Sequence, residues 1–111
     1  MTDVVLILTT VPNKESAERI ARTLVEERLA ACVSVVPGLT SFYWWKGDLI
    51  AEQEIQLIIK ATEFTIAKIE SRLKELHPYE LPEMVVLPVT SGSNAYLSWV
   101  RSETEQAVFR K

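Results

Sequence analysis

The chain has 111 residues, of which 48% are hydrophobic and 24% are charged, and its formal net charge is −3. This length and composition predict a single compact domain over residues 1–111, because a second independent core would not fit. The acidic balance argues against nucleic acid as a partner, since phosphate backbones attract positively charged surfaces.

The start of the chain and its cysteine content indicate a compartment. The first four residues lack the basic stretch of a secretory signal, and no apolar run approaches the roughly 20 residues that span a bilayer. Cys32 is the only cysteine, so it cannot form a disulfide within the chain, which fits a reducing environment. We therefore expect a cytoplasmic protein that has no membrane partner.

The first part of the chain predicts a strand followed by a helix. Residues 3–11 are a β-branched apolar run typical of a buried central strand, and Pro12 closes it. Between Glu15 and Leu29, apolar residues recur at steps of three and four. This spacing predicts a helix, with Asn13 or Ser16 as its N-cap.

A long hairpin is predicted in the middle of the chain. Residues 31–45 favour a bent strand interrupted at Pro37-Gly38, residues 46–48 predict a tight reversal, and the next strand alternates polar and apolar residues up to Ala61. Arms of about 15 residues would reach about 50 Å, whereas a domain of this size has a radius of gyration near ~13 Å. Part of the hairpin is therefore expected to overhang its own core.

The overhanging, aromatic-rich hairpin predicts self-association. An isolated hairpin is only marginally stable in water, so a partner chain is expected to cover it, and strand edges are the expected means of association. In the alternative, Pro37-Gly38 breaks the strand and the ribbon folds back onto its own subunit.

The last part of the chain predicts a helix, a strand and a helix. A helix capped by Thr62 is predicted to stop before Pro78, and a loop over residues 77–82 follows. A fourth strand is predicted over residues 83–89 and a final helix over residues 94–110. The order βαββαβ predicts an α+β, ferredoxin-like sandwich with a long hairpin between the second and third strands and an extra C-terminal helix.

Five motifs follow one another along nearly the whole chain. They are Glu26-Glu27-Arg28-Leu29-Ala30-Ala31-Cys32-Val33, Ser41-Phe42-Tyr43-Trp44-Trp45-Lys46-Gly47, Glu54 with Ile59-Lys60-Ala61-Thr62, His77-Pro78-Tyr79-Glu80-Leu81-Pro82-Glu83, and Tyr96-Leu97-Ser98-Trp99. In this order they resemble the CutA family of divalent-cation tolerance proteins. The resemblance implies a ferredoxin-like homotrimer, a role in tolerance to divalent metals, copper binding as in some members, and structural kinship with trimeric PII-type signal proteins.

The chain departs from that family in its cysteines. Some members carry cysteines near the end of the first strand and before the His-Pro-Tyr motif, whereas this chain has Thr9 and Arg72 in those regions. This departure argues against a copper site that is built from several thiols.

Three residues are candidate metal ligands: Cys32, His77 and Glu83. The Cys32 thiol suits soft ions such as Cu(I), and the alternative is a small buried hydrophobe. His77 is the only imidazole, and it either ligates a metal beside the acidic side chains of its loop or favours a helix C-terminus when protonated. A tight four-ligand site is impossible within one chain, so a threefold assembly is expected to join ligands of different chains around Cu(II), Cu(I) or another divalent cation, without an organic cofactor.

A second set of residues predicts a ligand cleft. The set comprises Tyr43, Trp45, Glu54, Lys60, Tyr79 and Trp99. Glu54 and Lys60 share the polar face of the third strand, and the alternative is that they form an ordinary solvated ion pair. The tryptophans are alternatively anchors of the core or of subunit interfaces. The acidic run Glu52-Gln53-Glu54 is expected to be exposed and solubilising, and the alternative is that it attracts cations.

The predicted function is that of a divalent-cation tolerance protein, with metal ions and two further copies of the chain as partners. It is expected to bind copper or another divalent heavy-metal ion and to take part in the response to metal ions. No Ser-His-Asp, zinc-hydrolase or glycine-rich phosphate motif occurs, so a non-enzyme is predicted. The alternative is a PII-like trimeric signalling protein that binds a small anionic metabolite between subunits, with Lys60 as its charge partner.

Overall fold

A computed structural model describes residues 2–105 and contains four strands and three α-helices among them. The elements are β1 (Val4–Val11), α1 (Lys14–Glu26), β2 (Cys32–Trp45), β3 (Asp48–Thr62), a short 3-10 turn (Glu63–Thr65), α2 (Ile66–Leu76), β4 (Val85–Pro88) and α3 (Asn94–Glu103). The predicted βαββαβ order, followed by a last helix, is confirmed.

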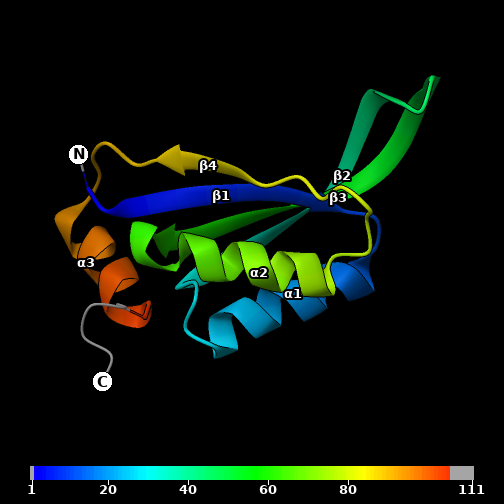
Figure 1. Cartoon of the computed structure of the whole chain (residues 1–111). Helices are drawn as coiled ribbons and strands as arrows, with labels where there is room; N and C mark the ends of the chain where they lie inside the picture. The colour runs from blue at the N-terminus through cyan, green and yellow to red at the C-terminus, as the bar shows by residue number, and fades with distance from the viewer. Residues whose placement is uncertain (1, 106–111) are drawn as a thin grey trace.

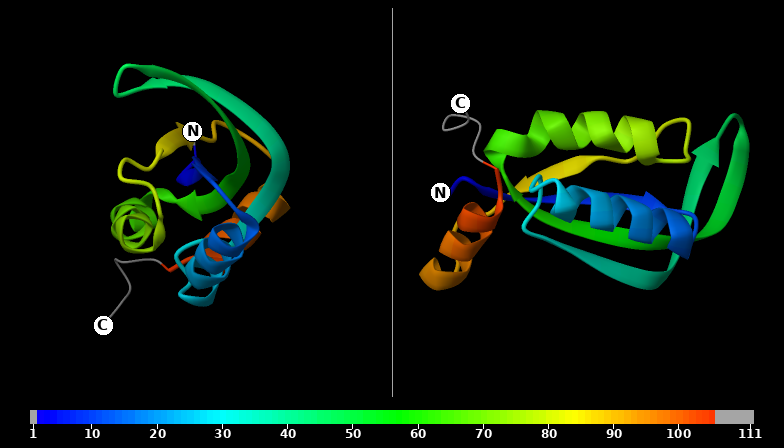
Figure 2. Two further views of the ribbon diagram at one scale, coloured as in Figure 1. Left: turned by 90° about the vertical axis from the view of Figure 1, so that its right-hand side faces the viewer. Right: turned by 90° about the horizontal axis from the view of Figure 1, so that it is seen from below.

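The four strands form one antiparallel sheet in the order β2-β3-β1-β4, and α1 and α2 lie side by side against one face of it (Figures 1 and 2). The main core lies between these two layers and contains Ile7, Ile20, Leu57, Ile59 and Leu73, none of which is more than 1% exposed. This arrangement is the predicted ferredoxin-like sandwich. It leaves β2 and β4 at the two edges of the sheet.

A second apolar cluster attaches α3 to one end of the sheet (Figure 1). Leu97 and Val100 of α3 pack against Val4 at the start of β1 and against Ala31 just before β2. The helix is capped by Ser93, whose hydroxyl accepts a hydrogen bond from the Tyr96 amide. None of the helices in the described part of the chain is both long and apolar enough to cross a membrane.

Several predicted boundaries differ from the structure. The first helix ends at Glu26 rather than Leu29, because Arg28 has a left-handed φ of 62° and the Leu29 amide turns back to the Leu24 carbonyl. β4 covers residues 85–88 rather than 83–89. The last helix ends at Glu103, whereas it was predicted to reach residue 110, and residues 106–111 lie outside the described part.

The two predicted helix caps have different outcomes. Asn13 caps α1 as predicted, since its Oδ1 accepts a hydrogen bond of 2.8 Å from the Ser16 amide. The predicted Thr62 cap is wrong, because the Thr62 hydroxyl makes no hydrogen bond within the described chain and a 3-10 turn precedes α2. In this turn it is the Thr65 hydroxyl that forms a hydrogen bond with the backbone, since it donates to the Leu29 carbonyl at 2.8 Å.

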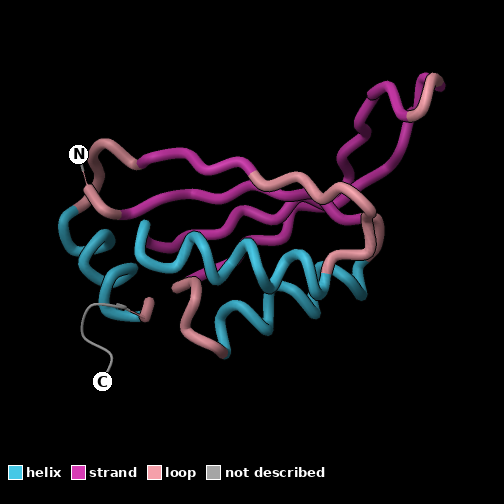
Figure 3. Tube along the Cα trace, in the orientation of Figure 1, coloured by secondary structure: helices cyan, strands magenta, loops and turns pink. Residues whose placement is uncertain are grey.

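The hairpin of β2 and β3 bends away from the rest of the sheet, as Figures 1 and 3 show. Opposite residues pair as Val36 with Gln56 and Leu39 with Glu54, so β2 carries one extra residue at Pro37-Gly38. Such a bulge bends a strand and increases its twist. The described chain measures 46 × 29 × 22 Å and its radius of gyration is 14.7 Å, which confirms the predicted overhang.

The bent hairpin has one covered face and one open face. Its inner face carries Tyr43 and lies against the loop that follows α2. The alternative in which Pro37-Gly38 breaks the strand and folds the ribbon back is wrong, because β2 continues through these residues as one strand with a bulge. On the outer face, Phe42 and Trp44 are each 71% exposed and Leu49 is 61% exposed. Large apolar side chains are rarely left in the open as a contiguous patch on a protein that remains monomeric.

Candidate functional site

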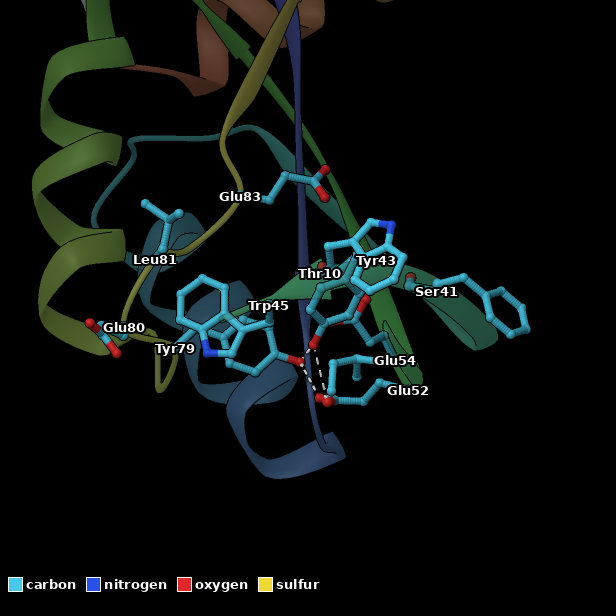
Figure 4. A pocket seen from close by; sticks show the side chains of 13 residues that line it. Thr10, Ser41, Tyr43, Trp45, Glu52, Glu54, Tyr79, Glu80, Leu81 and Glu83 are labelled. Atoms are coloured by element: carbon cyan, nitrogen blue, oxygen red, sulfur yellow. Dashed lines mark hydrogen bonds between the residues drawn. The ribbon is translucent and has the colours of Figure 1, made fainter. Parts of the chain in front are cut away.

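A cleft of about 590 Å³ lies between the inner face of the hairpin and the loop after α2 (Figure 4). It is lined by Thr10, Ser41, Phe42, Tyr43, Trp44, Trp45, Ile50, Glu52, Glu54, Tyr79, Glu80, Leu81 and Glu83. The lining therefore combines aromatic rings with four carboxylates. Pockets of this size hold small molecules in other proteins.

Hydrogen bonds between tyrosines and glutamates connect the two walls of the cleft. The Tyr79 hydroxyl donates to Glu54 Oε2 at 2.6 Å and lies 3.2 Å from Glu52 Oε1, and the Tyr43 hydroxyl lies 3.2 Å from Glu52 Oε2 (Figure 4). Alternation along β3 puts Glu52 and Glu54 on one face, and the hairpin register puts Tyr43 on the same face. The hairpin geometry thus presents both carboxylates to the tyrosine of the loop.

The environment of these groups keeps the phenols protonated. Burial raises the pKa of Tyr79, and its hydrogen bond to Glu54 raises it further. The pKa of Tyr43 is also raised, by burial and by Glu52, while partial burial and the charge of Glu54 raise the pKa of Glu83. The two tyrosines therefore remain hydrogen-bond donors to the carboxylates at neutral pH.

Cations are scarce around these carboxylates. In the described part of the chain, no lysine, arginine or histidine nitrogen lies within salt-bridge distance of Glu52, Glu54 or Glu83. The exception in the lining is Glu80, which pairs with Lys46 at 3.6 Å, and the same ammonium lies 5.6 Å from the centroid of the Trp45 ring. The cleft therefore carries uncompensated negative charge.

His77 lies behind the cleft and orients its loop. The ring is 7% exposed, its Nε2 lies 2.8 Å from the Thr10 carbonyl, and its Nδ1 accepts a 3.2 Å hydrogen bond from the Tyr79 amide. A carbonyl can only accept, so Nε2 carries the proton and the ring is neutral. Burial lowers the pKa of His77, although the Thr10 bond and the charge of Glu54 act in the opposite direction.

The family model described as CutA1 divalent ion tolerance protein matches residues 5–103. The chain belongs to this family. It is 52% identical over 104 residues to the "Divalent-cation tolerance protein CutA" of Thermus thermophilus, a match that covers 94% of this chain and 99% of the relative. The family description and this name refer to tolerance of divalent ions, not to a catalysed reaction.

Solved CutA structures share the fold. The structure of CutA from Xylella fastidiosa superposes with a TM-score of 0.91 at 46% identity, covering 94% of this chain and all of that one. The structure of the periplasmic divalent cation tolerance protein CutA from Archaeoglobus fulgidus superposes with a TM-score of 0.88 at 35% identity, and the match covers 92% of this chain and 99% of that one. That relative is described as a periplasmic protein.

Five of the predicted site residues meet at the cleft: Tyr43, Trp45, Glu54, Tyr79 and Glu83. Trp99 does not, since it lies on α3 against the Tyr96 ring, with 5.7 Å between the ring centroids. Lys60 is also absent from the lining within one chain. The described lining offers carboxylates where an anionic metabolite would need a cation, so the PII-like alternative is not favoured.

Cys32 and Lys60 face each other across the hairpin, away from the cleft lining. They are paired in the β2–β3 register, and Lys60 Nζ lies 3.7 Å from Cys32 Sγ and 2.8 Å from Ser34 Oγ. The predicted ion pair between Lys60 and Glu54 is therefore not formed. Cys32 is partly exposed rather than fully buried, and the structure does not bring it to His77 or Glu83 in one chain.

Sequence reasoning missed two features of the cleft: the contacts of Glu52 with the tyrosines and the burial of Glu54. The run Glu52-Gln53-Glu54 was expected to be exposed and solubilising, yet Glu52 is half-buried and accepts two tyrosine hydroxyls, and Glu54 is only 6% exposed. The contact between Tyr43 and Glu52 could have been predicted from the hairpin register, which places Tyr43 diagonally opposite Glu52. The contact between Glu54 and Tyr79 could not be predicted in this way, because Tyr79 is 25 residues from Glu54 along the chain.

Proposed function

We propose that this protein is a divalent-cation tolerance protein that binds copper or another divalent heavy-metal ion and is not an enzyme. Its family membership and the names of its relatives support this function. The observation that supports the metal-binding part is the uncompensated negative charge of the cleft, to which the proposed ligand Glu83 contributes together with Glu52 and Glu54. A field of this sign concentrates cations near the surface.

We propose a homotrimer as the form that binds the metal. The outer face of the hairpin leaves Phe42, Trp44 and Leu49 open, and β4 at the other edge of the sheet exposes Val85 and Leu87. Burying these side chains between copies would remove them from water. In addition, no group of three metal-ligating side chains is placed to hold an ion within residues 2–105, so a complete site needs ligands from more than one copy.

The proposed ligands are Cys32 of one copy with His77 and Glu83 of another. Sulfur, imidazole nitrogen and carboxylate oxygen form a donor set that suits copper. The thiol is partly exposed and Glu83 is exposed, so both can reach a second chain. The His77 ring would have to release the hydrogen bond that its Nδ1 accepts from Tyr79.

The cytoplasm is the proposed location, because Cys32 is the only cysteine and a free thiol persists in a reducing compartment. Cell fractionation of the native host tests this location. Recovery of the protein in the periplasmic or another non-cytoplasmic fraction would contradict it.

Calorimetric titration with Cu(II) in the presence of a competing chelator tests the metal site. We expect saturable binding at one or three ions per trimer, with at least about tenfold weaker binding in Cys32→Ser and in Glu83→Gln. Glu18→Gln serves as the control, since it removes an exposed carboxylate of α1 that does not line the cleft. Unchanged affinity for Cu(II) in both site variants would show that these ligands are wrong. If the protein does not compete with the chelator for Cu(II), the proposal that it binds this metal is wrong.

A further inference from the structure

The nitrogen of His77 that could bind a metal ion is covered by Tyr79. The Nε2 of the ring carries the proton and donates to the Thr10 carbonyl at 2.8 Å, so Nδ1 holds the free lone pair of the ring. This lone pair accepts the 3.2 Å hydrogen bond from the Tyr79 amide, and His77 is only 7% exposed. A metal ion therefore reaches Nδ1 only after Tyr79 has moved away from it.

Further contacts hold Tyr79 in this position. Its ring lies next to the His77 ring, with 4.9 Å between the centroids. Its hydroxyl donates to Glu54 Oε2 at 2.6 Å and lies 3.2 Å from Glu52 Oε1 (Figure 4). All of these contacts lie within one chain, and none involves the outer face of the hairpin that other copies are proposed to cover. Assembly through that face therefore leaves them in place.

We propose that Tyr79 is a cover over the metal site, so that a divalent ion binds His77 only when the loop after α2 releases this tyrosine. The inference rests on the proposed function, because it concerns one of the ligands proposed there. Since binding and closure exclude each other, the apparent affinity for the metal is reduced by the fraction of chains that are open. Any change that weakens the hold on Tyr79 therefore strengthens metal binding, and a bound metal weakens that hold.

The variant Tyr79→Phe tests the cover, because it removes the hydroxyl that binds Glu54 and keeps the amide and the ring. In a calorimetric titration with Cu(II) and a competing chelator, we expect this variant to bind at least about fivefold more tightly than the unaltered protein. Tyr96→Phe is the matched control and should leave the affinity unchanged, since its hydroxyl belongs to α3 and lies outside the cleft lining and the proposed ligands. Unchanged or weaker Cu(II) binding in Tyr79→Phe would overturn the proposal.

Hydrogen exchange of the unaltered protein tests the same proposal without a variant. Ligand binding ordinarily slows amide exchange, because it stabilises the folded state. We expect the Tyr79 amide instead to exchange faster with saturating Cu(II) than without metal, because the ion takes the lone pair to which this amide donates. The His77 amide, which donates to the Leu73 carbonyl at 2.8 Å, is the internal control and should not exchange faster. Slower or unchanged exchange at Tyr79 would contradict the proposal.

The outcomes separate this inference from the proposed metal function. Saturable Cu(II) binding that neither tightens in Tyr79→Phe nor speeds exchange at the Tyr79 amide would contradict the cover alone. If neither the unaltered protein nor any variant binds Cu(II), the proposed function is wrong and the cover is wrong with it. Tighter binding in Tyr79→Phe together with weaker binding in His77→Gln would support both, because it links the gain in affinity to the covered ligand.

Discussion

At the scale of single residues, the contact between Tyr79 and Glu54 ties the loop after α2 to the hairpin. The 2.6 Å hydrogen bond joins a half-buried hydroxyl to a carboxylate that is 6% exposed. Without this donor the carboxylate would remain buried and unsatisfied, which is more costly than the net value of a hydrogen bond. This pair is therefore expected to stabilise the wall of the cleft.

The variant Tyr79→Phe measures that contribution. We expect its free energy of unfolding to fall by about 1–3 kcal/mol relative to the unaltered protein, as for other buried polar groups that lose a partner. Urea denaturation at one fixed protein concentration gives the value. Tyr43→Phe is the matched control and should lose less, because its 3.2 Å bond goes to the half-buried Glu52. Equal losses in the two variants would contradict the special burial of Glu54.

His77 predicts a pH dependence of stability. Its pKa in the folded protein lies below the ordinary value of 6.5, so the unfolded chain takes up the proton first as the pH falls. The stabilisation is therefore fully present above pH 6.5, and it is lost as the pH falls from 6.5 toward the lowered pKa. We expect urea denaturation between pH 7.5 and 5 to give a steeper loss of stability in the unaltered protein than in His77→Gln. Parallel curves would contradict a neutral, buried His77.

Residue types at the cleft could be predicted from the sequence more readily than their burial. The aromatic cluster and the 77–83 segment identified Tyr43, Trp45, Tyr79 and Glu83 as site residues, and these line the cleft. The burial of Glu54 could not be derived from alternation along β3, because alternation does not distinguish solvent from a loop that folds over the same face. The covering residue lies in a different part of the chain.

At the scale of elements, the hairpin turn depends on two residues with positive φ, Lys46 at 51° and Gly47 at 87°. Turns of two such residues match the twist of paired strands, and glycine adopts this conformation without steric cost. The turn sets the register that brings Tyr43 diagonally opposite Glu52. Backbone geometry at the tip thus positions the carboxylates of the cleft.

Gly47→Ala tests the turn. We expect a loss of about 1 kcal/mol in the free energy of unfolding, because alanine disfavours the left-handed region. Gly92→Ala is the control: its new Cβ would meet Leu97 at an ordinary contact distance of 3.5 Å, and its φ is not positive. It should change stability by less than about 0.5 kcal/mol in the same urea series. A loss in Gly92→Ala as large as that in Gly47→Ala would exclude backbone conformation as the cause.

Element order was predictable because apolar spacing changes clearly from strand to helix along this chain. Element ends were less predictable. Arg28 carries no glycine-like signal, yet its left-handed conformation ends α1, and Thr62 resembles an N-cap although its hydroxyl makes no hydrogen bond within residues 2–105. The hydroxyl that does bond in this turn is that of Thr65, and its acceptor, the Leu29 carbonyl, lies 36 residues away, which local sequence does not reveal.

At the scale of the whole molecule, the open face of the hairpin predicts the oligomeric state. Trp44→Glu places a charge in the exposed apolar patch, and charges are depleted from the cores of interfaces. Light scattering should show a mass closer to that of one chain, while circular dichroism retains the fold. Ser71→Glu adds the same charge at an exposed polar position of α2, away from the hairpin, and should leave the mass of the assembly unchanged. Dissociation by both variants would indicate a general charge effect.

The central claim is that copies of this chain assemble to bind a divalent metal ion. Native mass spectrometry of the protein with Cu(II) reads the assembly and its metal content in one spectrum. We predict a species of three chains that carries one or three copper ions, with the copper lost from Cys32→Ser. A single chain without copper, or a trimer whose copper content is the same with and without Cys32, would contradict the account.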